Sequence, residues 1–218
     1  MSRTSAARLP AEAETRAGLP VLAFATAKAL GNWLGKQPEG APGLWLRLAK
    51  KGNGTPSVAH AEAIETALCH GWIDGQIDKY DGAWWLVRMT PRKPRSRWSE
   101  KNRATALRLI AEGRMAPAGL AQVQAAQADG RWEQAYAPQS TATVPPDLQA
   151  ALDASPAART FFSTLTGANR YAILYRVHEA KTAKTRAARI AKFIGMLERG
   201  EVLHPPGPRK STVASKAG

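Results

Sequence analysis

The sequence predicts an α+β fold, with a small antiparallel sheet and helices in the N-terminal half and a helical C-terminal half. Residues 43–51, "GLWLRLAKK", place Leu44, Leu46 and Leu48 on one face of a strand. An Asp81-Gly82 pair stands between two runs rich in β-forming residues, which is typical of a hairpin turn. From Ser99 onward, apolar residues recur at helical spacing almost throughout, which predicts the helical half.

The first elements follow from capping residues and apolar spacing. Residues 1–18 show no apolar period and are expected to be a flexible tail, followed by an α+β domain over residues 19–139. Thr26 is placed to cap a helix that reaches residue 36. After the strand, Ser57 is expected to begin a helix that ends at Gly71, because glycine commonly closes a helix.

The remaining elements are a hairpin and a series of helices. The run "WIDGQIDKYDGAWWLVRMT", residues 72–90, predicts the hairpin, and Ser99 and Pro117 predict the starts of two helices, which Gly113 and Gly130 end. Residues 140–146 are expected to form a linker, residues 147–202 a helical region and residues 203–218 a second flexible tail. The helical segments are predicted near 147–154, 157–165, 169–181 and 184–199.

Charge is the strongest compositional signal. The 218 residues include 31 lysines and arginines against 17 acids, a formal net charge of +14, and 44% hydrophobic residues provide for a core. Residues 88–103 carry seven basic residues and one acid, and residues 170–199 carry eight basic residues and two acids. Such an excess favours anionic partners, which include a small anion, an acidic protein and a nucleic acid.

Several classes of protein and site are disfavoured. Cys69 is the only cysteine, so an internal disulfide is impossible and a reducing cytoplasm is expected. No run reaches the ~18 apolar residues of a membrane helix, so an integral membrane protein is not expected; acids before residues 19–30 and Lys28 within them disfavour a signal peptide. The histidines do not cluster and no glycine-rich phosphate loop occurs, so neither a metal site nor a cofactor is predicted.

The stretch "MTPRKPRSRWSEKN", residues 89–102, is the main candidate site. Ser99 is placed to cap a helix whose first N–H groups favour an anion. Asn102 stands where a capping box has Glu or Gln, which leaves its side chain available for a ligand. Guanidinium groups of Arg92 and Arg97 beside such a helix start form a receptor for a carboxylate or phosphate.

The same residues also have structural interpretations. A basic run is most often a solvated loop, and a serine before a helix often does no more than cap it. Trp98 has the chemistry to stack on a base or a sugar, but packing as a hydrophobic staple before the helix is favoured.

Strand residues near the hairpin extend the candidate site. Trp72 and Asp74 share a face by alternation. A two-residue turn at Asp81-Gly82 pairs Asp74 with Met89, whereas a one-residue bulge pairs Asp74 with Arg88; in both registers the carboxylate and the guanidinium are expected within diagonal reach. A cross-strand ion pair of small energetic weight is favoured over a catalytic role. Asp74 and Asp78 are expected to share a face, a weak signal for paired acids.

Three phrases together resemble a bacterial family. They contain "GWIDG", residues 71–75, "TPR" followed by "RWSEKN", residues 90–102, and "KTRAARI", residues 184–190. In order and spacing, over about Leu22 to Gly200, they resemble the YdeI/OmpD-associated proteins, often labelled bacteriocin-protection proteins. The resemblance implies a role in resisting bacteriocins or cationic antimicrobial peptides, association with an outer-membrane porin in some members, and no established catalytic activity.

Three functions are compatible with these observations. A non-catalytic binding protein in a stress or peptide-resistance setting, with a pocket for a small anion or an acidic partner, is favoured. Nucleic-acid binding is the second, because of the two basic segments. An enzyme with Asp74 as general base and Arg88 or Arg92 holding an anionic substrate is the third; a nearby arginine lowers the pKa of a carboxylate and makes it a poor base.

Overall fold

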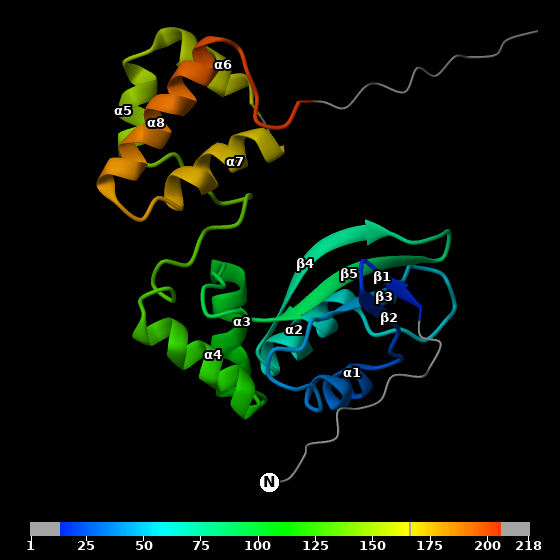
Figure 1. Cartoon of the computed structure of the whole chain (residues 1–218). Coiled ribbons are helices and arrows are strands. Elements are labelled where there is room, and N and C mark those ends of the chain that lie inside the picture. Colours follow the sequence, from blue (N-terminus) through cyan, green and yellow to red (C-terminus); the bar gives the residue numbers. More distant parts are fainter. Residues whose placement is uncertain (1–13, 166, 206–218) are drawn as a thin grey trace, which may run out of the picture. The chain divides into compact units, whose positions relative to one another are not determined.

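The computed structural model describes residues 14–165 and 167–205 (Figure 1). The chain divides into two compact units, Met1–Ala135 and Tyr136–Gly218. Described strands occur only in the first unit and helices in both, which confirms the α+β class. The first unit contains β1 (Thr15–Arg16), β2 (Leu19–Leu22), α1 (Ala27–Leu34), β3 (Leu44–Ala49), α2 (His60–Cys69), β4 (Trp72–Lys79), β5 (Trp84–Pro91), α3 (Glu100–Ala111) and α4 (Pro117–Ala128). The second contains α5 (Pro146–Asp153), α6 (Pro156–Thr164), α7 (Gly167–His178) and α8 (Ala183–Glu198).

The sheet has the strand order β1-β2-β3-β5-β4. The sheet is mixed, rather than antiparallel throughout as the sequence predicts, because β2 and β3 run parallel to each other. Helix α1 connects these two strands along the chain. Residues 14–18, which the sequence predicts as tail, instead contain β1, paired with β2. Ala17 and Gly18, with φ values of 48° and 75°, form the two-residue turn between them, and positive φ at both central positions is typical of a type I′ turn.

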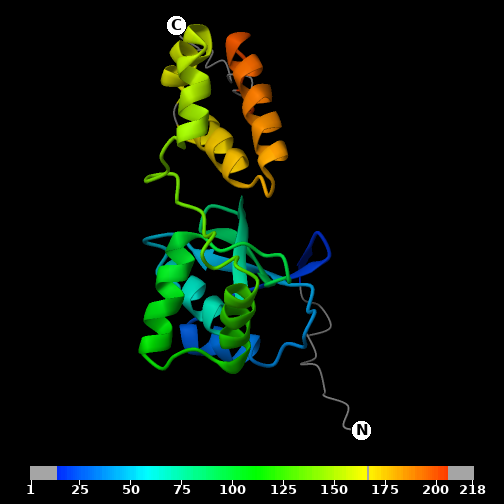
Figure 2. The same ribbon diagram turned by 90° about the vertical axis from the view of Figure 1, so that its left-hand side faces the viewer.

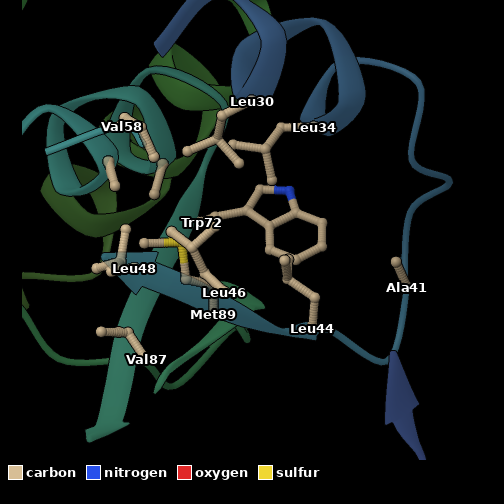
Figure 3. Packing of buried hydrophobic residues seen from close by; sticks show 12 residues of the cluster. Leu30, Leu34, Ala41, Leu44, Leu46, Leu48, Val58, Trp72, Val87 and Met89 are labelled. Atoms are coloured by element: carbon tan, nitrogen blue, oxygen red, sulfur yellow. The ribbon is translucent and has the colours of Figure 1, made fainter. Parts of the chain in front are cut away.

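Helices α1 and α2 pack on one face of the sheet. Leu44, Leu46 and Leu48 of β3 line that face as predicted, all nearly inaccessible to solvent. The Trp72 ring lies among them beneath α1, near Leu30 (Figure 3). Burying these large apolar groups removes them from water, which is the main contribution to the stability of this layer.

Helix α2 begins later than the sequence predicts. Ser57 does not cap it; the Ser57 hydroxyl accepts a hydrogen bond from the Ala49 N–H and donates one to the Val58 carbonyl. The helix begins at His60, and the Glu62 carboxylate accepts from the Ala59 N–H just before it. A competing contact to the end of β3 therefore places His60, and not Ser57, at the start of α2.

A close backbone approach joins α4 to the end of α2. A Cβ atom at Gly119 would lie 2.3 Å from the Cys69 carbonyl oxygen, and one at Gly71 would lie 2.9 Å from the Ala118 carbonyl oxygen. The Ala116 N–H also donates to the Cys69 carbonyl at 3.0 Å. Only glycine leaves enough room at these two contacts.

The second unit has its own core, built from α5 to α8. Figure 2 shows α5 and α8 side by side, in agreement with their contacts. Phe162, Ile173 and Phe193 are buried together, and Leu148 and Leu197 complete the centre of the cluster. The predicted stripe of α8 is therefore core, as its spacing of three and four residues indicates.

Candidate functional site

The start of α3 has the cap that the sequence predicts. The Ser99 hydroxyl accepts a hydrogen bond from the Asn102 N–H at 3.1 Å. In the described part of the chain, the side-chain amide of the partly buried Asn102 makes no hydrogen bond. The helix start thus keeps a half-buried polar amide beside its first turn.

Arg92 is buried against Trp98 and is 6% exposed. Its guanidinium carbon lies 3.6 Å from the centroid of the Trp98 ring, and its Nη1 donates to the Arg97 carbonyl at 3.1 Å. Trp98 is 1% exposed and meets Trp132 edge to face, with 4.8 Å between ring centroids. Trp98 therefore packs inside the first unit, and Arg92 supports the loop that leads into α3. Their ligand-binding role stays a prediction.

The hairpin separates Asp74 from Arg88. Asp74 pairs with Met89, so the first of the two registers considered above is the one observed at this point. Met89 is buried on the helix-covered face, whereas Arg88 pairs with Trp45 on the opposite face and is exposed. Asp74 and Arg88 therefore do not face each other, because neighbouring residues of a strand point to opposite faces.

A register shift between Asp74 and Ile77 also separates the two aspartates. Asp74 lies on the helix-covered face, but Asp78 pairs with Leu86 on the other face and forms an ion pair with Arg16 at 2.5 Å. The prediction that Asp74 and Asp78 share a face is wrong, because one extra residue in β4 reverses the alternation of side chains after the bulge. Paired-acid chemistry between them is excluded by this geometry.

The structure brings Asp74 together with two residues that the sequence does not single out as a site. His60, at the start of α2, interacts electrostatically with Asp74 of β4 and with Lys101 in the first turn of α3. The His60 ring packs edge to face on Trp85 of β5, with 4.9 Å between ring centroids. Four elements therefore contribute one side chain each to a group that we call the His60 cluster: His60, Asp74, Trp85 and Lys101.

The electrostatics of the His60 cluster favour a neutral imidazole. Burial lowers the pKa of His60 below its ordinary value; the Asp74 carboxylate opposes this effect, and the Lys101 ammonium adds to it. His60 Nε2 is shielded from solvent and has no hydrogen-bond partner in the residues that the structure describes. The cluster thus combines a positive charge, a negative charge and an unsatisfied ring nitrogen.

The predicted site residues therefore fall into three places. Asp74 belongs to the His60 cluster, and Ser99 and Asn102 lie beside Lys101 in sequence at the start of α3. Trp72, Arg92 and Trp98 are buried, Arg97 is partly buried next to Trp98 in the loop, and Arg88 lies on the other face of the sheet. Sequence reasoning missed His60 and Lys101, because only the fold brings residues 60, 74 and 101 together.

Two negative findings apply to the described residues. Within 14–165 and 167–205, no three His, Cys, Asp or Glu side chains are grouped as metal ligands would be. None of the helices in these ranges has the length and apolarity that crossing a membrane requires.

Two family models match the chain. Residues 22–122 match a domain of unknown function (DUF8412), and residues 141–200 match the family described as "Bacteriocin-protection, YdeI or OmpD-Associated". Residues 141–200 of the chain thus form a region of the YdeI/OmpD-associated type, in agreement with the resemblance of the sequence to that family. The "KTRAARI" segment of α8 lies inside the YdeI/OmpD-associated match, whereas "GWIDG" and "RWSEKN" lie in the domain of unknown function. No curated protein and no solved structure gives a significant match.

The arginines of the "KTRAARI" segment hold α7 in place. Arg186 Nη1 donates to the Val177 carbonyl at 2.9 Å, and Arg189 Nη1 donates to the Arg176 carbonyl at 2.5 Å. Both carbonyls belong to the last turn of α7, where helix carbonyls have no partner within their own helix. This YdeI/OmpD-associated segment therefore caps a neighbouring helix from the side.

Proposed function

We propose that this YdeI/OmpD-associated protein is a non-catalytic binding protein of the cytoplasm, which binds a small anionic group at the His60 cluster. Its proposed role is protection against bacteriocins or cationic antimicrobial peptides. The bound group is a carboxylate or phosphate that lies between Lys101 and His60, near the capped start of α3. An acidic segment of a protein partner, including a porin-associated one, offers the same chemistry.

The observation that carries the proposal is the convergence of His60, Asp74 and Lys101 from three separate elements. Lys101 supplies a full positive charge and the α3 start adds the partial positive charge of a helix N-terminus. Trp85 provides an apolar wall beside the imidazole. Asp74 favours a ligand that carries a donor group, such as an amine or hydroxyl, next to its anionic group.

Binding is favoured over catalysis by the same geometry. A general base needs a proton on the substrate within hydrogen-bond reach and a partner that stabilises the developing charge. Asp74 is only partly buried, and no second carboxylate shares its face at Asp78. The arginines considered as substrate clamps lie elsewhere: Arg92 is buried against Trp98, and Arg88 lies on the opposite face of the sheet.

The test is a titration of His60 followed by NMR. An anion near the imidazole stabilises its protonated form, so a bound ligand raises the pKa of His60. The probes are inorganic phosphate, small amino acids with acidic side chains, and nucleoside monophosphates. We expect at least one of them to shift the His60 resonances in a saturable manner.

Two lysine variants show whether the shift reports the proposed site. Lys101→Gln removes the proposed cation and is expected to abolish the ligand-dependent shift. Lys93→Gln removes an exposed lysine of the same basic segment and is expected to leave it unchanged. If no probe moves the His60 resonances, or if both variants respond like the wild type, the proposed site is wrong.

The biological role is tested separately in cells. A bacterium that lacks its own copy is challenged with a cationic antimicrobial peptide while it expresses the wild-type protein or Lys101→Gln. Protection by the wild type and its loss in Lys101→Gln are expected. Equal survival of all strains would overturn the role in protection, and equal protection by both proteins would separate that role from the His60 cluster.

A further inference from the structure

The face of the sheet opposite α1 and α2 carries aromatic rings and arginines. Alternation along β3 and β5 puts Trp45, Arg47, Trp84, Leu86 and Arg88 on this face. Its small apolar cluster, made of Leu19, Val21, Trp45 and Leu86 with Tyr80 packed against it, contains no helix residue. We call this surface of the first unit the open sheet face.

Arg47 occupies the centre of an aromatic group on the open sheet face. Its guanidinium carbon lies 4.9 Å from the Trp84 ring centroid and 5.5 Å from that of Tyr80. Its Nη1 makes a long hydrogen bond of 3.4 Å to the Tyr80 hydroxyl, and its buried Nε has no partner among the described residues. The buried Nε donor therefore lacks an acceptor within the described ranges, although buried donors are normally satisfied.

The charge of the open sheet face is positive. Arg88 is exposed and forms no ion pair within the described ranges, and Arg47 forms none there either. Asp78 is paired with Arg16, and the Glu14 carboxylate accepts from the Tyr80 hydroxyl at 2.6 Å. Asp78 is thus paired with a cation, whereas Glu14 keeps its negative charge beside Tyr80; the two guanidinium groups of Arg47 and Arg88 outnumber this one carboxylate.

We propose that the open sheet face binds single-stranded nucleic acid. Bases stack on the partly exposed rings of Trp84 and Tyr80, and phosphates accept hydrogen bonds from Arg47 and Arg88. Aromatic rings bind bases irrespective of sequence because every base has a flat face, and arginines along the same surface bind the backbone. This site is separate from the His60 cluster, which lies on the helix-covered face.

The geometry selects a single strand rather than a duplex. The bases of a duplex are stacked on each other, so the rings of a sheet reach them only after the strands separate. Arg47 and Arg88 stand on adjacent strands with a spacing of two positions along the sheet, which suits a flexible backbone crossing the face.

The test measures the binding of a labelled oligothymidylate and a labelled oligouridylate to the full chain by fluorescence anisotropy over a range of salt concentrations. We expect affinity to fall with salt, with a log-log slope of about −0.7 for each phosphate contact. Arg88→Gln is expected to reduce the magnitude of this slope by about 0.7. Trp84→Leu keeps the charge and is expected to weaken binding about fivefold or more.

Controls separate this site from general attraction to a basic protein. Lys36→Gln removes the same charge after α1, on the helix-covered side, and is expected to bind like the wild type. Arg88 is exposed, so Arg88→Gln tests the site even if Trp84→Leu fails to fold. Wild-type affinity in Arg88→Gln, or a duplex or inorganic polyphosphate of equal charge that binds as tightly as the single strand, would overturn the proposal.

Discussion

The guanidinium of Arg92 lies over the buried ring of Trp98, with 3.6 Å between the guanidinium carbon and the ring centroid. A cation held over an aromatic ring away from water is stabilised by the negative face of the ring. Arg92 also donates to the Arg97 carbonyl, so it fixes the loop between β5 and α3. The charge of Arg92 indicates a ligand site in the sequence, and the contact with Trp98 gives the same residue a structural role.

Arg92→Ala is expected to lower the free energy of unfolding by about 2 kcal/mol, since it removes the ring contact and a partly buried hydrogen bond together. Chemical denaturation followed by tryptophan fluorescence measures the change. Arg95→Ala is the matched control, because Arg95 is exposed in the same loop. An Arg92→Ala protein as stable as Arg95→Ala would contradict a structural role for Arg92. Any ligand screen that uses Arg92→Ala must therefore be corrected for lost stability.

Gly119→Ala is expected to destabilise the first unit by about 3 kcal/mol, at the upper end of ordinary overpacking, because the added methyl group meets backbone atoms that cannot rotate away. The relevant contacts are 2.3 Å and 2.8 Å from the Cys69 carbonyl oxygen and carbon. Thermal unfolding followed by circular dichroism measures the effect. Gly82→Ala, whose added Cβ would have no atom within 4 Å, is expected to unfold near the wild-type temperature. Equal melting of the two variants would show that α4 can move away from α2.

Arg186→Gln is expected to destabilise the second unit by about 1 to 2 kcal/mol. The change removes the hydrogen bond to the Val177 carbonyl and the forked pair with Asp147, at 2.5 Å and 2.8 Å. Lys192→Gln removes an exposed charge from the same helix and is the control. Hydrogen exchange of the last turn of α7 is expected to accelerate only in Arg186→Gln. Unchanged exchange there would contradict the capping role.

Stability is expected to fall as the pH is lowered below about 6.5. Burial lowers the pKa values of His60 and His70 in the folded chain, whereas the unfolded chain has histidines near the ordinary value of 6.5. The unfolded state therefore binds more protons in this range. The contribution of both residues is complete above pH 6.5 and is lost progressively as the pH falls toward their lowered pKa values. Urea denaturation at several pH values measures this loss.

The histidine variants provide the control for that dependence. The His60→Gln/His70→Gln double variant is expected to lose most of the change in stability between pH 7.5 and 5.5, because glutamine does not titrate. A double variant with undiminished pH dependence would assign the effect to other groups.

Local signals predicted most of the elements. Thr26 and Ser99 cap the helices that the sequence assigns to them, and the apolar spacing of Ile190, Phe193 and Leu197 identified the buried face of α8. Such features depend on residues a few positions apart, and the sequence displays them directly. Strand β1 was not predicted, because its turn relies on Ala17 at positive φ, which is uncommon for alanine.

The site was harder to predict than the fold. The sequence marked Asp74, Ser99 and Asn102, but nothing in it connects His60 with Asp74, since their electrostatic interaction depends on how α2 lies on the sheet. Basic residues looked alike in the sequence, yet Arg92 is buried, Arg88 is exposed on the other face and Lys101 interacts electrostatically with His60. Burial and side-chain direction, which separate these three roles, are set by tertiary packing.

The bulge between Asp74 and Ile77 lets β4 hold one residue more than the segment of β5 that it faces. One residue fewer at positions 75–76 would restore regular pairing, with Asp74 still opposite Met89 and Asp78 still opposite Leu86 and beside Arg16. A one-residue gap at these positions in a related sequence would therefore leave the distribution of charge between the two sides of the sheet unchanged. For such relatives, the identities of the residues aligned with Asp74 and Asp78 are more informative than the number of residues between them.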